Sequence, residues 1–364
     1  MKGLLPLLLC AALSSACART LPEAYVRARD SAEKSYGSGD FGDAGQAWLE
    51  AAQRADTARD RSEARYRAAT SFERSGQLDR AGELYTLLAN GHSDRAARAT
   101  FALADLRIQS GDAAGGTVAL EAAFRKYPSS GVANLALRRY FAMLAEHGGD
   151  QVVLDYIERV EPALRATELA EQLLYERGRR LEALGQAARA RDAYVDLADR
   201  FPYPHGAYWD DALLRSADCE VRLGQPERAI ALLERMLTAR ETSHLSGSYD
   251  RPRFADAAYH LAELYRDTRH DAEAARRAFH GVFVDDPTST LKDDALWQEA
   301  LLARHVSDTA ACAPLALLVE QLAESRYAPC AHEICPKIAT IPRRQCAEYL
   351  ERELRDQKPE PKPE

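Results

Sequence analysis

The chain has 364 residues, of which 46% are hydrophobic and 29% are charged, and its formal net charge is −8. This composition is typical of a folded protein and excludes a chain that is disordered throughout. A mildly acidic chain is also poorly suited to neutralising phosphates, so the charge argues against nucleic-acid binding.

The N-terminal segment reads as an export signal. Lys2 precedes a short apolar run over 4–13, and small residues follow. The run is too short to span a bilayer and is typical of a secretory signal peptide. Two cleavage sites remain open. Cleavage before Cys17, in a sequence that resembles a bacterial lipobox, would leave this cysteine to carry lipid. Ordinary cleavage two residues later would release a chain that starts at Arg19.

A repeated pattern runs through the body of the chain. Six glycines, each expected to end one helix and open a turn, stand 35 to 39 residues apart, and they are Gly39, Gly76, Gly111, Gly148, Gly185 and Gly224. A degenerate seventh turn is expected near His270. After each turn, a small, a large and a small or apolar residue recur at +5, +9 and +12, which lie on one helix face. Each unit is therefore predicted to be a helix–turn–helix that must stack on its neighbours.

This pattern resembles the tetratricopeptide repeat. The resemblance rests on five positions taken together: the turn glycine, the small residue seven places before it, the +5 alanine, the +9 aromatic and the +17 proline. The resemblance covers about residues 24–303. It implies an all-α fold, a right-handed α-solenoid of about seven helix-turn-helix repeats. An exported array of this kind also resembles the BamD-type outer-membrane assembly lipoproteins and the periplasmic Tol-Pal coordinator proteins. We expect four segments: a signal peptide over 1–18, the solenoid over 19–303, a Cys-rich helical cap over 304–355 and a disordered tail over 356–364.

The same resemblance implies a partner-binding groove lined by the first helix of each repeat. Transferring the family's groove positions to this sequence gives a candidate lining that mixes aromatic residues with both signs of charge. It contains Tyr36, Tyr66, Phe101, Arg138, Tyr175 and Arg179, together with Arg29, Glu33, Glu73, Arg98, Asp105 and Glu182. Tyrosine and arginine are frequent anchors in protein interfaces. The alternative is that the aromatic rings only pack between helices and the charges are solvated.

Three further features lie within the repeats. The aromatic and proline-rich segment 201–209 is expected to be a turn whose rings pack on neighbouring helices, with peptide binding as the alternative. Residues 241–252 interrupt the repeat spacing and are expected to form a loop. Cys219 falls within a repeat helix and is predicted to be a buried thiol.

Four cysteines cluster after the last repeat: Cys312, Cys330, Cys335 and Cys346. In an exported protein they favour two disulfides that staple a helical cap, and three pairings are open. Zinc, with His332 as a further ligand, is disfavoured because the spacing lacks a tight Cys-x-x-Cys pair. No metal or other cofactor is therefore expected.

The sequence contains no His-Glu-x-x-His motif, no phosphate-binding Gly-x-x-x-x-Gly-Lys loop and no Gly-x-Ser-x-Gly elbow, so we expect no enzyme. The prediction is an exported scaffold that binds a protein or peptide partner through the concave face of the solenoid, in envelope assembly or maintenance. The alternative is a structural envelope subunit that associates through its convex face or its cap. We expect a periplasmic protein held at the outer membrane only by lipid on Cys17, or else a soluble periplasmic one.

Overall fold

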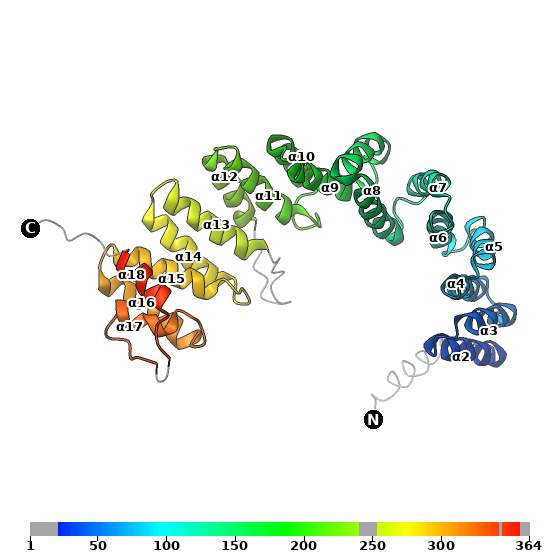
Figure 1. Cartoon of the computed structure of the whole chain (residues 1–364), viewed down its shortest axis with the longest axis horizontal. Coiled ribbons are helices and arrows are strands. Elements are labelled where there is room, and N and C mark those ends of the chain that lie inside the picture. Colours follow the sequence, from blue (N-terminus) through cyan, green and yellow to red (C-terminus); the bar gives the residue numbers. More distant parts are fainter. Residues whose placement is uncertain (1–20, 240–252, 342–343, 357–364) are drawn as a thin grey trace, which may run out of the picture. The chain divides into compact units, whose positions relative to one another are not determined.

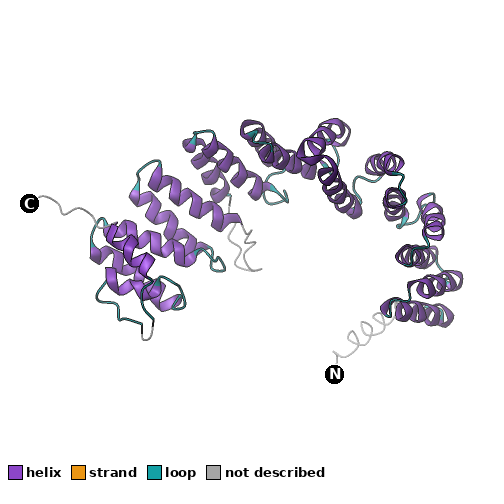
Figure 2. Ribbon diagram, viewed as in Figure 1, coloured by secondary structure: helices purple, strands orange, loops and turns teal. Residues whose placement is uncertain are grey.

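The computed structural model describes residues 21–239, 253–341 and 344–356, and these ranges contain helices and no strand (Figure 2). The chain divides into two compact units. The first comprises 1–143 with 162–169, and the second comprises 144–161 with 170–364. The predicted all-α repeat fold is confirmed. The expected signal peptide, the whole of the expected loop over 241–252 and all but the first residue of the expected tail over 356–364 lie outside the described residues.

The first unit is a run of helix pairs, in which each helix from α2 to α6 packs on the next one along the chain (Figure 1). Its complete helices are α2 (Glu23–Gly37), α3 (Phe41–Arg54), α4 (Ala58–Arg74), α5 (Leu78–Ala89), α6 (Ala96–Gln109) and α7 (Ala113–Lys126). The even-numbered members are the first helices of their repeats. The chain passes from one unit to the other within α8 (Gly131–Leu164), whose backbone is non-helical at Gly149.

The second unit continues the same arrangement, and each helix from α9 to α15 packs on its successor. Its helices are α9 (Ala170–Ala183), α10 (Ala187–Arg200), α11 (Trp209–Arg222), α12 (Pro226–Thr238), α13 (Arg253–Asp267), α14 (Ala272–Asp285), α15 (Lys292–Arg304) and α16 (Asp308–Gln321). Here the odd-numbered helices from α9 to α15 are the first helices. Three short helices complete the unit: η1 (Ala328–Cys330), α17 (Ala331–Ile334) and α18 (Glu348–Asp356).

The turns between paired helices use a left-handed residue. Five predicted glycines take φ values between 71° and 92°, and His270 at the degenerate seventh turn takes 52°. Glycine reaches this region without the penalty that a Cβ atom brings. At the fourth turn the predicted glycine was wrong by one residue. Gly149 has φ 71°, whereas Gly148 remains helical, because two consecutive glycines offered two registers.

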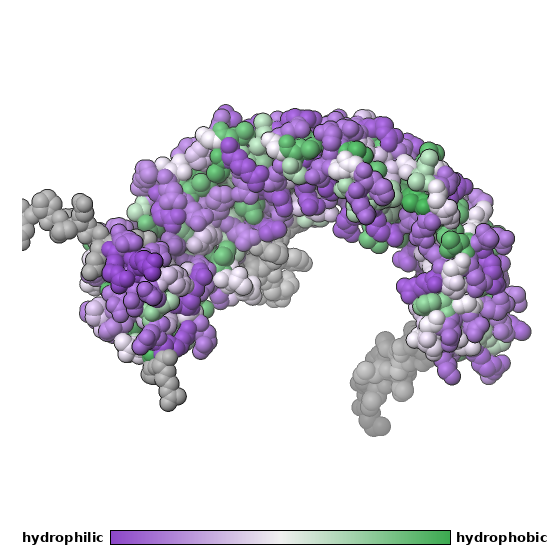
Figure 3. Space-filling view, viewed as in Figure 1, coloured by the Kyte–Doolittle hydropathy of each residue, from purple (hydrophilic) through white to green (hydrophobic). Residues whose placement is uncertain are grey.

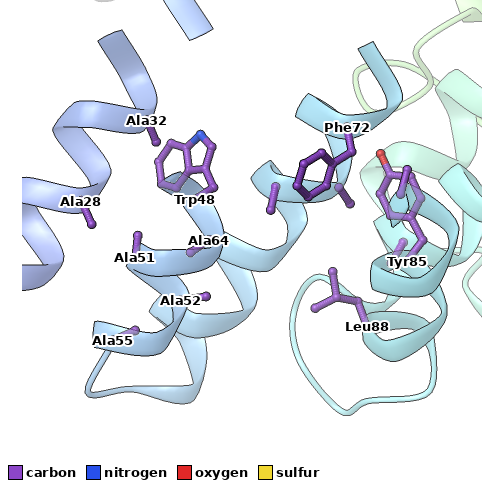
Figure 4. Packing of buried hydrophobic residues seen from close by; sticks show 14 of the residues in the cluster. Ala28, Ala32, Trp48, Ala51, Ala52, Ala55, Ala64, Phe72, Tyr85 and Leu88 are labelled. Carbon is purple, nitrogen blue, oxygen red and sulfur yellow. The ribbon is translucent and has the colours of Figure 1, made fainter. Parts of the chain in front are cut away.

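Small and large residues alternate in the core as the spacing predicted. In the first unit, the rings of Trp48, Phe72 and Tyr85 fill the space between alanines on neighbouring helices (Figure 4). Two glycines replace alanine where a ring comes closest. A Cβ atom on Gly45 would lie 2.6 Å from the Phe72 ring, and one on Gly178 would lie 2.4 Å from the Tyr194 ring. Close packing of this kind leaves no room for a methyl group.

Two disulfides join the elements that follow the last repeat. Cys312 is bonded to Cys335 and Cys330 to Cys346, which selects one of the three open pairings. The Nδ1 atom of His332, the ligand named in the zinc alternative, lies 2.6 Å from the carbonyl oxygen of Ile338. In the described part of the chain, no three His, Cys, Asp or Glu residues come together as a metal-binding group.

The remaining sequence features also take structural roles. The Tyr203 ring packs 5.5 Å from that of Trp209 and 6.3 Å from that of Phe254, so this part of 201–209 is a packed junction. Cys219 is fully buried and unpaired, as predicted, and burial raises the pKa of its thiol to about 11. A thiol with this pKa stays protonated and unreactive at neutral pH.

Candidate functional site

The first helices of the first unit enclose a pocket with a volume of ≈ 330 Å³. Its walls come mainly from α2 and α4, and α3 and α6 contribute one residue each. The lining includes Glu33, Tyr36, Trp48, Tyr66, Arg67 and Arg98. We call it the α2–α4–α6 pocket. Four of these residues, Glu33, Tyr36, Tyr66 and Arg98, were predicted from the groove positions, and the fold brings them together.

Helix periodicity explains why α4 contributes most to this pocket. Glu63, Tyr66, Arg67 and Thr70 all line it, and they stand three, four and seven residues apart. Residues at these spacings share one face of a helix. The sequence prediction found Tyr66 but missed Glu63 and Arg67, although the same spacing would have pointed to them.

Trp48 forms the floor of the pocket and was predicted only as a core residue. It is 3% exposed, and the Arg67 guanidinium lies 5.1 Å from the centre of its ring. Arg67 Nε also donates a hydrogen bond to Glu63, with a length of 2.8 Å. A cation over an indole ring is a favourable contact. Arg67 is therefore held by Glu63 and by the floor, and Glu63 pairs with Arg95 as well.

Two tyrosines supply the aromatic walls. The Tyr36 ring is supported by Phe41 at 5.1 Å and by the Arg74 guanidinium at 5.0 Å. The Tyr66 ring lies 5.9 Å from that of Tyr85. Burial raises the pKa of Tyr66, so its phenol stays protonated at neutral pH. Within the described ranges, neither Tyr36 nor Tyr66 uses its hydroxyl in a hydrogen bond, so both can donate one to a ligand.

Two charges of opposite sign complete the pocket. Glu33 on α2 and Arg98 on α6 are both exposed. Neither forms an ion pair with any other residue that the structure places. The other two charged residues of the lining, Glu63 and Arg67, are paired with each other. The pocket thus offers aromatic walls with one free carboxylate and one free guanidinium.

The other predicted groove residues of this unit, Arg29, Glu73, Phe101, Asp105 and Arg138, do not line this pocket. The prediction that Phe101 lines a binding groove is wrong. Phe101 is 2% exposed, and its ring packs 5.3 Å from that of Phe124. An apolar side chain at this depth is a packing residue and cannot touch a partner. Arg138 on α8 is exposed and does not line the α2–α4–α6 pocket.

A second hollow of ≈ 200 Å³ lies beside the ion pair of Asp105 and Arg139, whose closest atoms are 2.9 Å apart. Burial raises the pKa of Asp105, and Arg139 opposes that shift.

In the second unit, Tyr175 belongs to a polar network. Its ring stacks on that of Tyr208 at 4.2 Å, and its hydroxyl donates a hydrogen bond to Asp211. Burial and this carboxylate raise the pKa of Tyr175 to about 12. Asp211 also pairs with Arg215 at 2.7 Å and with Arg253 at 2.8 Å. Burial acts to raise the pKa of Asp211, but the hydrogen bonds from Tyr175 and Arg215 outweigh it and lower this pKa.

The charges around this network are also paired with one another. Glu182 accepts from Arg215 at 3.1 Å, from Arg222 at 2.8 Å and from the Tyr194 hydroxyl at 3.1 Å. Arg179, the last predicted groove residue, pairs with Glu176 at 3.3 Å. The polar groups of Tyr175, Arg179 and Glu182 are therefore already bonded to other residues of the second unit, whereas the α2–α4–α6 pocket keeps free groups.

On the face seen in Figure 3, hydrophilic residues cover most of the surface and apolar residues form small, scattered patches. None of the described helices has both the length and the apolar character that crossing a membrane requires. The lipidation candidate, Cys17, lies outside the described residues.

The comparison with protein families gives one match. Residues 211–240 match the family described as tetratricopeptide repeat. This segment coincides with α11 and α12, one predicted helix pair with its turn at Gly224. The match supports a helical repeat scaffold of the tetratricopeptide type. None of the curated proteins compared with the chain matches it.

Solved structures similar to this chain include other helical repeat proteins. One is the C-terminal part of a TPR repeat-containing protein from Cytophaga hutchinsonii, with 14% identity, coverage of 73% of this chain and 98% of that one, and a TM-score of 0.44. Another is PilF of Pseudomonas aeruginosa, with 17% identity, coverage of 67% and 99%, and a TM-score of 0.38. The human IFIT1 dimer with PPP-AAAA has 13% identity, coverage of 90% and 76%, and a TM-score of 0.43. Likenesses at this level carry no argument about what this chain binds.

Proposed function

We propose that this chain is a non-enzymatic, exported scaffold that binds an extended segment of a protein partner in the α2–α4–α6 pocket. The observation that carries the proposal is the state of the groups in this pocket. Tyr36 and Tyr66 have free hydroxyls, and Glu33 and Arg98 have no ion partner among the placed residues. Aromatic rings that end in a polar group are common binding anchors, because they add apolar area at a low cost in conformational entropy.

The proposal places the scaffold in the bacterial envelope, in its assembly or maintenance. Its support is the N-terminal sequence, in which an apolar run is followed by small residues and Cys17. Lipid on Cys17 would hold the protein at the outer membrane. The intact mass of the mature protein tests this part: an acylated Cys17 at the new N-terminus is expected, and a chain starting at Arg19 would refute the anchor.

Site-specific photo-crosslinking tests the binding pocket. A photoreactive phenylalanine analogue replaces Tyr66 in one variant and Lys34 in another, in cells that make the full chain. Lys34 is the matched control, because it is exposed on α2 beside Glu33 but does not line the pocket. We expect a defined crosslinked protein from position 66 and none from position 34.

A second round identifies the role of the pocket. Arg98→Glu is introduced into the chain that carries the analogue at position 66, and the crosslink should weaken. Equal crosslinking from positions 66 and 34, or a crosslink that Arg98→Glu leaves unchanged, would contradict the proposal. A crosslink that arises only from Val118, which is 67% exposed on α7, would favour the alternative, a subunit that associates through its convex face, to which the second helices of the repeats are expected to belong.

A further inference from the structure

We infer that the occupant of the α2–α4–α6 pocket is the segment 357–364 of a second copy of this chain. The inference rests on the proposed function, because it uses the same pocket and names the segment that enters it. The segment lies outside the described residues, so the inference uses its sequence alone.

A charged residue and a proline alternate through this segment: Lys358-Pro359-Glu360-Pro361-Lys362-Pro363-Glu364. Proline fixes φ and has no N–H, which favours the extended polyproline II conformation. This helix has three residues per turn, so residues three apart share a face. One face therefore carries Lys358, Pro361 and Glu364, which are a cation, an apolar ring and an anion in that order.

The pocket offers the complementary groups in the same order. Glu33 lies on α2, Tyr36 and Tyr66 line the aromatic walls of α2 and α4, and Arg98 lies on α6. Aromatic-lined grooves are a recurrent binding mode for proline-containing segments in this conformation. Lys358 would then pair with Glu33, Pro361 would pack between the two tyrosine rings, and Glu364 would pair with Arg98.

From Lys358 to Glu364 the chain rises six residues, or about 19 Å at about 3.1 Å per residue. An α-helix with its side chains is about 10–12 Å across. The segment is therefore long enough to lie across more than one of the helices that line the pocket.

The pairing state of the charges sets the direction of binding. Glu63 and Arg67 are already paired with each other, so within the lining only Glu33 and Arg98 are left to attract new charges. A segment that lies in the reverse direction would place Lys358 beside Arg98 and Glu364 beside Glu33. Exposed ion pairs add little to affinity, so these pairs choose the direction while the rings hold the proline.

Docking the tail of one copy on the pocket of another is a heterologous contact, in which the two copies use different surfaces. Association through it depends on concentration and joins copies head to tail. Arg98→Glu is expected to disrupt it by repulsion from Glu364. Arg107→Glu is the matched control, because Arg107 is exposed on the same helix, has no ion partner among the placed residues and does not line the pocket.

Two measurements test the inference on the mature full-length chain. A fluorescently labelled synthetic peptide with the sequence of residues 357–364 is titrated with the chain, and its anisotropy is followed. We expect saturable binding of the peptide to the unsubstituted chain. Arg98→Glu should weaken this binding about tenfold, and Arg107→Glu should leave it unchanged. A peptide with the change Glu364→Lys should again bind tightly to the Arg98→Glu chain. Sedimentation equilibrium should show a mean mass that rises with protein concentration and falls back in Arg98→Glu.

Each outcome decides a separate point. A peptide that does not bind, or that binds both arginine variants equally, overturns the inference. Peptide binding by a chain that stays monomeric at every concentration overturns the second copy as its source. If the peptide fails while crosslinking from position 66 persists, the inference falls and the proposed function stands. If both fail, the proposed function falls with it. Circular dichroism confirms that each variant is folded.

Discussion

Replacing Gly178 by alanine in α9 should destabilise the second unit, although alanine is the better helix former. A Cβ atom at this position would lie 2.4 Å from the Tyr194 ring, a distance at which a neighbouring group has to move. The ring has little freedom to move, because it is fully buried and its hydroxyl bonds Glu182 at 3.1 Å. Overpacking of this kind costs about 1–3 kcal/mol, whereas the helix propensity of alanine recovers about 1 kcal/mol. We expect a net loss of about 1 kcal/mol.

Gly281→Ala in α14 is the matched control in the same unit. Its Cβ atom would lie 3.6 Å from the Asp285 carboxylate, which is an ordinary contact. Only the helix-propensity gain remains there, so this variant should be more stable by up to about 1 kcal/mol. The same chemical change is thus expected to have opposite signs at two helical positions, with a difference of about 2 kcal/mol.

Urea denaturation followed by far-ultraviolet circular dichroism measures both variants against the unsubstituted chain. The midpoint of the second unit should shift to lower urea for Gly178→Ala and to higher urea for Gly281→Ala. The reasoning would be refuted if Gly178→Ala stabilised the protein, or if both substitutions shifted the midpoint in the same direction. Such a result would mean that Tyr194 can withdraw and that the close contact does not constrain the packing of α9 on α10.

Three other predictions use the same assay. Replacing Cys330 and Cys346 together by serine should lower the free energy of unfolding of the cap by about 3 kcal/mol, because the bond closes a loop with a sequence separation of 16 residues; an unchanged midpoint would contradict this. Gly76→Ala should cost about 1–2 kcal/mol through its φ of 76° alone, since nothing lies within 4 Å of the new Cβ atom. Asp211→Asn should flatten the acid dependence of stability. The pKa of this carboxyl is lowered in the folded state, so its contribution is present above about pH 4 and is lost as the pH falls through the folded-state pKa; equal slopes in titrations from pH 6 to pH 2 would argue against it.

The repeat architecture could be predicted because the fold imposes it on many positions at once. A ring such as Trp48 needs small neighbours on adjacent helices, and a turn such as that at Gly76 needs a residue that accepts positive φ. Each signal is weak alone, but the stacking of like units repeats it at a nearly constant spacing. The fourth turn shows the limit of such an argument, since Gly148 and Gly149 satisfy the pattern equally well and only the packed structure selects the second.

The binding positions were less predictable, because side chains at the same position of different repeats have different surroundings. Tyr66, Phe101 and Tyr175 all stand ten residues before their turn glycine. Tyr66 lines a pocket, Phe101 is buried against Phe124, and the Tyr175 hydroxyl is used by Asp211. The spacing defines the face of the helix, but the neighbours on other helices decide whether a side chain is free. For Phe101 and Tyr175 these neighbours stand 23 and 36 residues away, so no local pattern reports them.

Whether a charged side chain is already paired therefore indicates which unit can bind a partner, and the residue types at the repeat positions do not. A partner that took Arg215 or Asp211 of the second unit would first have to separate them from each other and from Glu182. Separating a partly buried pair leaves charges unpaired and costs about 2–5 kcal/mol, which the new contacts would have to offset. Glu33 and Arg98 have no such pair to lose among the residues that the structure places. For equal contacts with a partner, binding at the α2–α4–α6 pocket is therefore the more favourable, and the most informative first variants are those at Glu33 and Arg98.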